Sequence, residues 1–149
     1  MLRELFPIVS LTVFDLHGTD RLANWKKFRD SLETSQTPFE DVAVFWSRAP
    51  FVNLYLDPQQ PSSWPDPWHL VLEGKYDDLA ICLGMLYTIK LTQRFMDCSC
   101  EIHKSESIKK RDLKFFLVVD KKHILNMEYQ RVLTVDSNSV EASIIWTKH

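Results

Sequence analysis

The sequence has few glycines and few cysteines. Only three glycines occur in 149 residues, so most turns must depend on the seven prolines and on Asn, Asp and Ser. The three cysteines, Cys82, Cys98 and Cys100, are an odd and sparse set, which excludes a disulfide-rich secreted scaffold and favours a reducing compartment. No uninterrupted apolar stretch approaches the roughly 20 residues of a membrane helix, and the first residues lack the pattern of a cleaved signal peptide. We therefore expect an intracellular (cytoplasmic) or virion-associated protein with no membrane partner.

An excess of positive charge is also missing. The formal net charge is −2, which excludes a globally basic nucleic-acid binder. The apolar share of 45% and the aromatic share of 12% are typical of a folded globular protein. We expect one domain over 1–149. The segment 57–67 holds four prolines and reads as a stiff internal crossover, because the residues before it are too few to bury a core of their own.

The first third of the chain predicts two kinds of element. β-branched and aromatic residues over 7–16 favour a strand. Apolar residues at helical spacing predict a helix from Asp20 to about Glu33. Two short apolar runs, 41–46 and 51–56, favour two strands joined as a hairpin.

The rest of the chain predicts two helices followed by strands. Asp66 or Pro67 can open a short helix that Gly74 ends, and Asp77 and Asp78 stand at the start of a helix that is apolar nearly all round. The predicted strands that follow are 98–103, 113–119, 123–129, 131–135 and 140–147, with the clearest turns at 120–122 and 136–139. The pattern predicts an α+β fold: a mainly antiparallel sheet packed on a long central helix, with one or two further short helices.

The most informative stretch runs from Trp64 to Ala80: a rigid aromatic-proline turn, a glycine stop and a doubly acidic helix start. With the order of elements, it resembles the core of transglutaminase-like and related papain-like cysteine enzymes, over Trp64 to about Asp136. In that family a Gly-x-Cys-x-Asp-hydrophobic-Ala motif starts the central helix, and later strands supply a histidine and an aspartate. Here Tyr76 and Asp77 take the place of the nucleophilic cysteine.

The absence of a cysteine at the start of this helix determines which function we expect. A thiol at a helix start is activated by the amide dipoles, and neither tyrosine nor aspartate substitutes for it. Cys82 lies more than a turn into the helix, where an apolar environment opposes ionisation. We therefore expect no catalytic residues and lean away from an enzyme. The favoured interpretation is a non-catalytic interaction or structural subunit of a larger assembly, namely a phage-encoded component of a virus or phage particle.

Two alternatives stay open. The first is a cysteine-dependent hydrolase or acyltransferase of transglutaminase-like fold that uses Cys82 or Cys100 with His103 or His123. Its third member would be Asp120 or Asn126. The second is nucleic-acid binding through the basic region 104–122, which is possible but not favoured.

The pair Cys98 and Cys100 with His103 raises the question of a metal site, since thiolates and imidazoles bind zinc. Alternation along a strand puts the two thiols on one face and His103 on the other. We expect neither a metal nor a cofactor.

A protein partner is expected, and two groups of residues are candidates for contacting it. Trp64 and Trp68 are held on a stiff turn, where they serve either as interface anchors or as a cover for the domain's own core. Lys109, Lys110 and Arg111 are the centre of the basic region.

Overall fold

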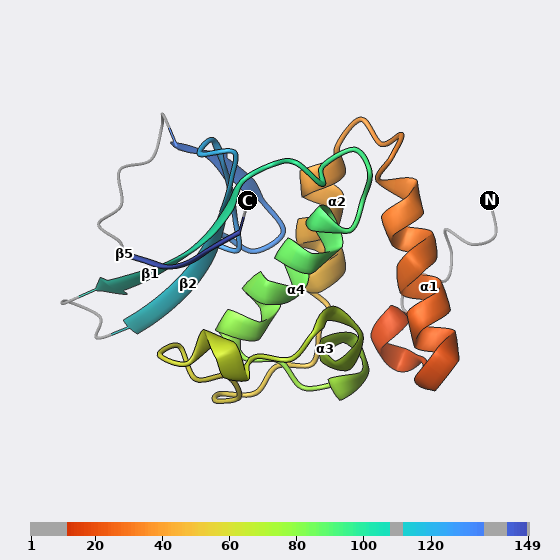
Figure 1. Cartoon of the computed structure of the whole chain (residues 1–149), viewed down its shortest axis with the longest axis horizontal. Coiled ribbons are helices and arrows are strands. Elements are labelled where there is room, and N and C mark those ends of the chain that lie inside the picture. The colour runs from red at the N-terminus through yellow and green to blue at the C-terminus, as the bar shows by residue number, and fades with distance from the viewer. Residues whose placement is uncertain (1–11, 108–111, 136–142, 149) are drawn as a thin grey trace.

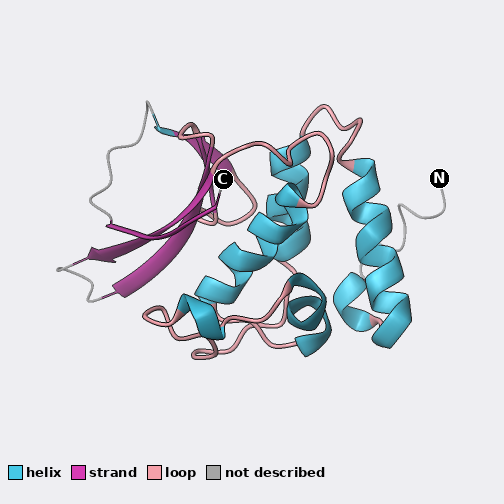
Figure 2. Ribbon diagram, viewed as in Figure 1, coloured by secondary structure: helices cyan, strands magenta, loops and turns pink. Residues whose placement is uncertain are grey.

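The structure is a computed structural model that describes residues 12–107, 112–135 and 143–148. In these residues, four α-helices and a five-stranded antiparallel sheet form an α+β fold, which confirms the predicted fold class. The helices gather on one side of the sheet, and α4 lies between the sheet and α1 (Figures 1 and 2). None of the described helices has the length and apolarity needed to cross a bilayer.

Helix α1 spans Gly18–Ser31, which confirms the helix predicted from Asp20. Its buried Arg21 donates hydrogen bonds to three backbone carbonyl oxygens, those of Phe14 (2.8 Å), Leu16 (2.8 Å) and Val71 (3.0 Å). Arg21 thereby joins α1 to the residues before it and to the later helix α3.

The strand predicted over 7–16 is not found where the chain is described. Residues 1–11 lie outside the described residues, and Val13–Asp15 form the short 3-10 helix η3. The Asp15 carboxylate accepts a hydrogen bond from the Thr12 backbone N–H at 2.8 Å. This local capping contact stabilises a helical turn in place of extended backbone.

Helix α2 spans Pro38–Trp46, so the strand predicted over 41–46 is wrong. Pro38 occupies a first-turn position, where its missing N–H has no cost, and acidic residues follow in the same turn. Phe39, Val42 and Trp46 are all buried. A short helix buried on most sides has an apolar run that resembles a strand in sequence.

The second strand of the predicted hairpin, 51–56, is also wrong. Phe51 makes an isolated parallel bridge with Tyr76. The backbone N–H groups of Tyr55 and Leu56 donate to Asp77 Oδ2, at 2.8 and 3.0 Å. The segment therefore runs beside the start of α4 instead of pairing with a neighbouring strand.

Both helices predicted around Gly74 are confirmed. Helix α3 spans Pro67–Glu73, and Asp66 caps it by accepting the His69 backbone N–H at 2.9 Å. Gly74 follows with φ of 82°, a left-handed conformation that glycine adopts without steric cost.

Helix α4 spans Asp78–Lys90, 13 residues against 14 in α1, so it is distinguished by burial and not by length. Asp77 caps it by accepting the Ala80 backbone N–H at 2.9 Å. In the last turn of the helix, the Thr88 hydroxyl accepts hydrogen bonds from the indole N–H groups of Trp25 (3.1 Å) and Trp46 (2.9 Å). These contacts anchor α1 and α2 on the same turn of α4.

The sheet has the strand order β4-β3-β2-β1-β5. Its strands, which confirm the predicted succession, are β1 (Cys100–Ser107), β2 (Asp112–Val119), β3 (His123–Leu125), β4 (Val132–Thr134) and β5 (Ser143–Lys148). Strand β3 is shorter than predicted, because Asn126 with φ of 69° leaves the extended conformation. The turn at 120–122 is confirmed, and the one predicted at 136–139 lies outside the described residues.

The two faces of the sheet belong to separate apolar clusters. Cys100, Ile102 and Leu117 join the main core together with the helices. Phe116, Val118 and Ile124 form a smaller cluster on the other face. Alternate residues along β1 or β2 therefore face α4, and the residues between them face away from it.

The single-domain organisation over 1–149 stays a prediction.

Candidate functional site

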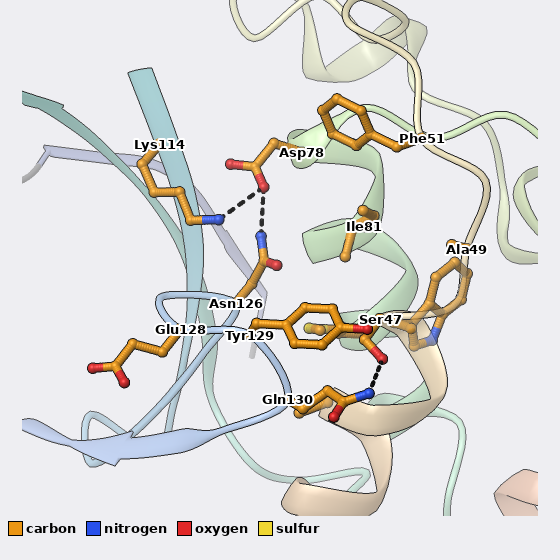
Figure 3. A pocket seen from close by; sticks show the side chains of 13 residues that line it. Ser47, Ala49, Phe51, Asp78, Ile81, Lys114, Asn126, Glu128, Tyr129 and Gln130 are labelled. Carbon is orange, nitrogen blue, oxygen red and sulfur yellow. Dashed lines mark hydrogen bonds and ion pairs between the residues drawn. The ribbon is translucent and has the colours of Figure 1, made fainter. Parts of the chain in front are cut away.

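A pocket lies between α2, the first turns of α4 and the chain that follows β3; we call it the α4 pocket (Figure 3). Its volume is about 280 Å³, and its lining is mostly apolar. Trp46, Ile81 and Met85 contribute from the helices, while Phe51 and Tyr129 contribute aromatic rings from the connecting chain. Phe51 is 60% exposed and Tyr129 73% exposed, so these two rings offer apolar surface to solvent.

The polar part of the α4 pocket is built around Asp78, the first residue of α4. Asp78 Oδ1 accepts hydrogen bonds from Lys114 Nζ at 3.2 Å and from Asn126 Nδ2 at 2.8 Å. Its Oδ2 accepts the backbone N–H of Phe115 at 2.7 Å. Figure 3 shows the Lys114 and Asn126 side chains pointing at this carboxylate. The carboxylate thus connects the start of α4 with β2 and with the end of β3.

Asn126 is the residue that brings the cluster together. Its amide nitrogen also contacts the Phe115 carbonyl oxygen at 3.0 Å and Cys82 Sγ at 3.4 Å. The positive φ at this position turns the chain at the end of β3 and aims the amide at α4. Asn126 was one of two residues considered for the third member of a cysteine site, and the structure places it beside a cysteine.

That cysteine, Cys82, is fully buried. Burial raises the pKa of the Cys82 thiol well above its usual value, and the nearby Asp78 carboxylate raises it further. The Asn126 hydrogen bond acts in the opposite direction but does not compensate. Since the thiolate is the nucleophile, burial of Cys82 opposes its reactivity in this conformation.

The position of the nucleophile in the family motif is occupied by a core residue. Tyr76 is completely buried; its hydroxyl donates to the Val71 carbonyl oxygen at 2.8 Å and accepts the Gly74 backbone N–H at 3.3 Å. Burial raises the pKa of the Tyr76 hydroxyl. The neighbouring Asp77 carboxylate accepts hydrogen bonds from three backbone N–H groups. Neither residue lines the α4 pocket.

The candidate histidines lie outside the α4 pocket. His103 stacks on Phe116 in the cluster on the other face of the sheet, and its Nε2 contacts Glu101 Oε1 at 3.1 Å. His123 packs against the Phe39 ring, with 4.7 Å between ring centroids. Asp120, the other candidate for a third member, accepts the Ser99 backbone N–H at 3.0 Å. Among the residues that the structure describes, no cysteine-histidine pair is therefore assembled at the pocket.

Cys98 and Cys100 share one face at the start of β1, with 3.8 Å between their sulfur atoms. Both are buried, and His103 lies on the opposite face. Among the described residues, no group of three or more His, Cys, Asp and Glu side chains is arranged to hold a metal ion.

The residues predicted to contact a partner differ in their surroundings. Trp64 packs against the main core, and its indole N–H donates to the Asp57 carbonyl oxygen at 2.7 Å. Trp68 is 45% exposed and packs edge-on against Trp25. Lys109, Lys110 and Arg111 lie outside the described residues. The partner-contacting role of all five, and nucleic-acid binding through 104–122, stay predictions.

Sequence reasoning missed several residues of the α4 pocket. Phe51, Tyr129 and Gln130 were not candidates, and Lys114 was noted solely as part of the basic region. Gln130 Nε2 donates to Ser47 Oγ at 3.0 Å, which links the chain after β3 to the end of α2 (Figure 3). The aromatic Tyr129, at the end of the predicted strand 123–129, was the available signal.

Comparison with known proteins gives a clear structural likeness. No family model matches the chain, and no curated protein matches it in sequence. The calcium-bound structure of LapG from Legionella pneumophila superposes with a TM-score of 0.66 at 14% identity, covering 92% of this chain and 80% of LapG. A second LapG structure gives 0.65 with 78% of LapG covered, and an EGTA-treated one gives 0.64 with 77%, both at 14% identity and 92% of this chain.

This likeness supports the expected resemblance to the transglutaminase-like and papain-like cysteine-enzyme fold. It also corrects the functional expectation. The interpretation as a non-catalytic structural subunit of a virus or phage particle is wrong, because the matching structures are of a bacterial protein of the cysteine-enzyme fold. The alternative, a hydrolase of transglutaminase-like fold, agrees better with these structures.

Proposed function

We propose that the α4 pocket is a substrate site for an extended chain that carries amide or acyl groups, the substrate class of transglutaminase-like hydrolases and acyltransferases. The observation that carries the proposal is the place of the pocket. It opens at the first turn of α4, where the resemblance puts the catalytic motif, and is closed on the other side by β2 and the end of β3.

The composition of the α4 pocket suits such a ligand. Small-molecule and peptide sites are mostly apolar clefts with a few convergent polar groups. Here the aromatic rings of Phe51 and Tyr129 offer flat apolar surface for a side chain, and Lys114 and Gln130 offer N–H donors for carbonyl oxygens. The Lys114 side chain is 41% exposed. Its ammonium group can therefore donate a hydrogen bond to a ligand while it also donates one to Asp78 Oδ1.

Binding can be tested with a set of N-acetylated, C-amidated hexapeptides that vary in their apolar side chain. Isothermal titration calorimetry gives the dissociation constant of each peptide. We expect at least one peptide to bind, and Phe51→Ala and Tyr129→Ala each to weaken binding about tenfold by removing apolar contact area.

A matched control is Leu54→Ala. Leu54 is 83% exposed and does not line the α4 pocket, so its truncation should leave the dissociation constant unchanged. Absence of binding by every peptide, or binding that Phe51→Ala and Tyr129→Ala do not alter, would refute the proposed site.

A second candidate function is the cysteine-dependent hydrolase or acyltransferase itself, with Cys82 as nucleophile. The observation that favours it is the Asn126 amide, which contacts both Cys82 Sγ and Asp78 Oδ1. Hydrogen bonds thus connect a thiol, an amide and a carboxylate beside the pocket. The raised pKa of Cys82 opposes this function in the described conformation, so bound peptide would have to uncover and ionise the thiol.

Thiol labelling separates the two candidates. If Cys82 is catalytic, iodoacetamide labels it faster when peptide is bound, the peptide is turned over, and Cys82→Ser abolishes turnover. If neither labelling nor turnover occurs while peptide still binds, Cys82 is excluded as a nucleophile and the substrate site stands.

A further inference from the structure

The start of β1 holds a pair of thiols that the α4 pocket does not use. Cys98 and Cys100 point to the same side of the chain, with their sulfur atoms 3.8 Å apart. They lie near Lys90, the last residue of α4, whereas the α4 pocket is at the first turns of that helix. The two sites are therefore at opposite ends of α4.

The backbone around Ser99 holds the two thiols on one side. The Ser99 N–H donates to Asp120 Oδ1 at 3.0 Å, and the Ser99 carbonyl oxygen accepts the Asp120 N–H at 2.8 Å. With both backbone groups of the intervening residue engaged, rotation that would separate the sulfur atoms is restricted. The thiols are pre-positioned for an intramolecular reaction.

Lys90 supplies positive charge to this site. Its ammonium group donates to the carbonyl oxygens of Cys98 (2.7 Å) and Met96 (2.6 Å), which keeps it beside the pair. A cation near a thiol favours the thiolate. The Asp120 carboxylate, on the other flank, acts in the opposite direction.

The two thiols are not equivalent. Cys98 retains 9% exposure, while Cys100 has none. The hydrogen bond between the two sulfur atoms lowers the pKa of Cys98 and raises that of Cys100. The difference in exposure selects Cys98 as the residue that reacts first with an external molecule.

We propose that Cys98 and Cys100 form a thiol–disulfide exchange site, whose oxidising substrate is a low-molecular-weight disulfide. The Cys98 thiolate attacks one sulfur of that disulfide; a mixed disulfide forms at Cys98, and the other half leaves as a thiolate. Cys100 then loses its proton and attacks Cys98 Sγ. This second attack breaks the mixed disulfide, releases the second thiolate and forms the Cys98–Cys100 bond.

The reaction balances without a further co-reactant. Two cysteine thiols lose two electrons and two protons, and one external disulfide gains them to become two thiols. The sulfur separation of 3.8 Å has to contract to the roughly 2.05 Å of a disulfide when the bond forms. Oxidised and reduced forms then interconvert with the thiol pool.

The experiment is treatment of the full, folded chain with glutathione disulfide, followed by alkylation and intact-mass and peptide analysis. We expect the wild-type chain to lose two hydrogens and to show a Cys98–Cys100 bridge that dithiothreitol reverses. Cys100→Ser cannot complete the second step, so it should accumulate one glutathionyl group on Cys98. Cys98→Ser should stay unmodified.

Cys82→Ser is the matched control, because Cys82 is a buried cysteine outside this pair and its replacement should leave the bridge intact. Circular dichroism verifies the fold of each variant, and Cys100→Ala replaces Cys100→Ser if the serine variant does not fold. A wild-type chain that keeps both thiols free after prolonged treatment would overturn the proposal. So would a mixed disulfide at Cys100 in place of Cys98.

Discussion

Gly84 of α4 lies directly beneath the indole ring of Trp46 of α2, so closely that a Cβ atom at residue 84 would overlap the ring. Absence of a side chain at this position allows the two helices to approach, and the Trp46 indole N–H can then reach the Thr88 hydroxyl one turn further on. This close approach also sets the depth of the α4 pocket, because Trp46 forms part of its wall.

Gly84→Ala should therefore destabilise the fold. Overpacking of a filled core costs about 1–3 kcal/mol, which exceeds the roughly 1 kcal/mol that alanine gains over glycine in a helix. Urea denaturation measures the loss in unfolding free energy. In a Trp46→Leu background the same change should cost less, since the ring is gone; equal losses in both backgrounds would contradict the steric explanation.

Thr88→Val should be more harmful than its small change in shape suggests. It removes the hydroxyl that accepts the N–H groups of Trp25 and Trp46, and each buried donor left without a partner costs about 1–3 kcal/mol. We expect a loss of at least about 2 kcal/mol in unfolding free energy. Thr88→Ser, which keeps the acceptor, is the matched control and should retain most of the stability that the valine variant loses.

Asp77→Asn tests the function of the acidic helix start. The Asp77 carboxylate accepts backbone N–H groups from Tyr55, Leu56 and Ala80, and the amide offers a single acceptor oxygen. We expect a loss of about 1–3 kcal/mol, measured by thermal and urea unfolding. Asp66→Asn, at the exposed cap of α3, should have a smaller effect. If the two variants are equally stable, the connection to 55–56 contributes nothing.

His123 should make stability depend on pH. Burial lowers the pKa of its imidazole, and the nearby Lys122 charge lowers it further, while Glu40 and Asp120 oppose this. The unfolded chain therefore takes up a proton first, at about pH 6.5, so its contribution to stability is present above that pH and decreases as the pH falls below it. Urea unfolding at pH 7.5 and pH 5 measures the decrease.

His123→Gln should reduce this decrease between pH 7.5 and pH 5. His17→Gln, which replaces an exposed histidine at the start of α1, is measured in parallel as a control for the substitution itself. An unchanged pH dependence in His123→Gln would show that other groups are responsible.

The sequence predicts the parts of the fold whose signals are local. Asp66, Pro67, Gly74 and Asp77 each act on the backbone within a few residues, and both helices around them are found as predicted. Helix α2 was mistaken for a strand because its side chains are buried on most sides, although Pro38 and the acidic first turn indicated a helix start. Periodicity identifies a helix with two unlike faces better than one surrounded by core.

The candidate site was harder to predict, because tertiary contacts assemble it. Asp78, Lys114 and Asn126 are far apart in sequence and meet where β2 and the end of β3 pack against α4. The sequence shows that no cysteine lies at the start of α4. The structure shows that Tyr76, at that position, is completely buried in the core. The sequence could not show that Asn126 turns toward Cys82, since this depends on a backbone angle at the end of β3.

The three hydrogen bonds of Arg21 end on main-chain carbonyl oxygens, those of residues 14, 16 and 71. Every amino acid supplies such an oxygen, so the side chains at these three positions can change through mutation without disconnecting the guanidinium. Arg21 itself has no such freedom, since lysine lacks the fork of donors that reaches three acceptors at once. The link that Arg21 makes between α1 and α3 therefore depends on one side chain and on the backbone, and not on which side chains its three partners carry.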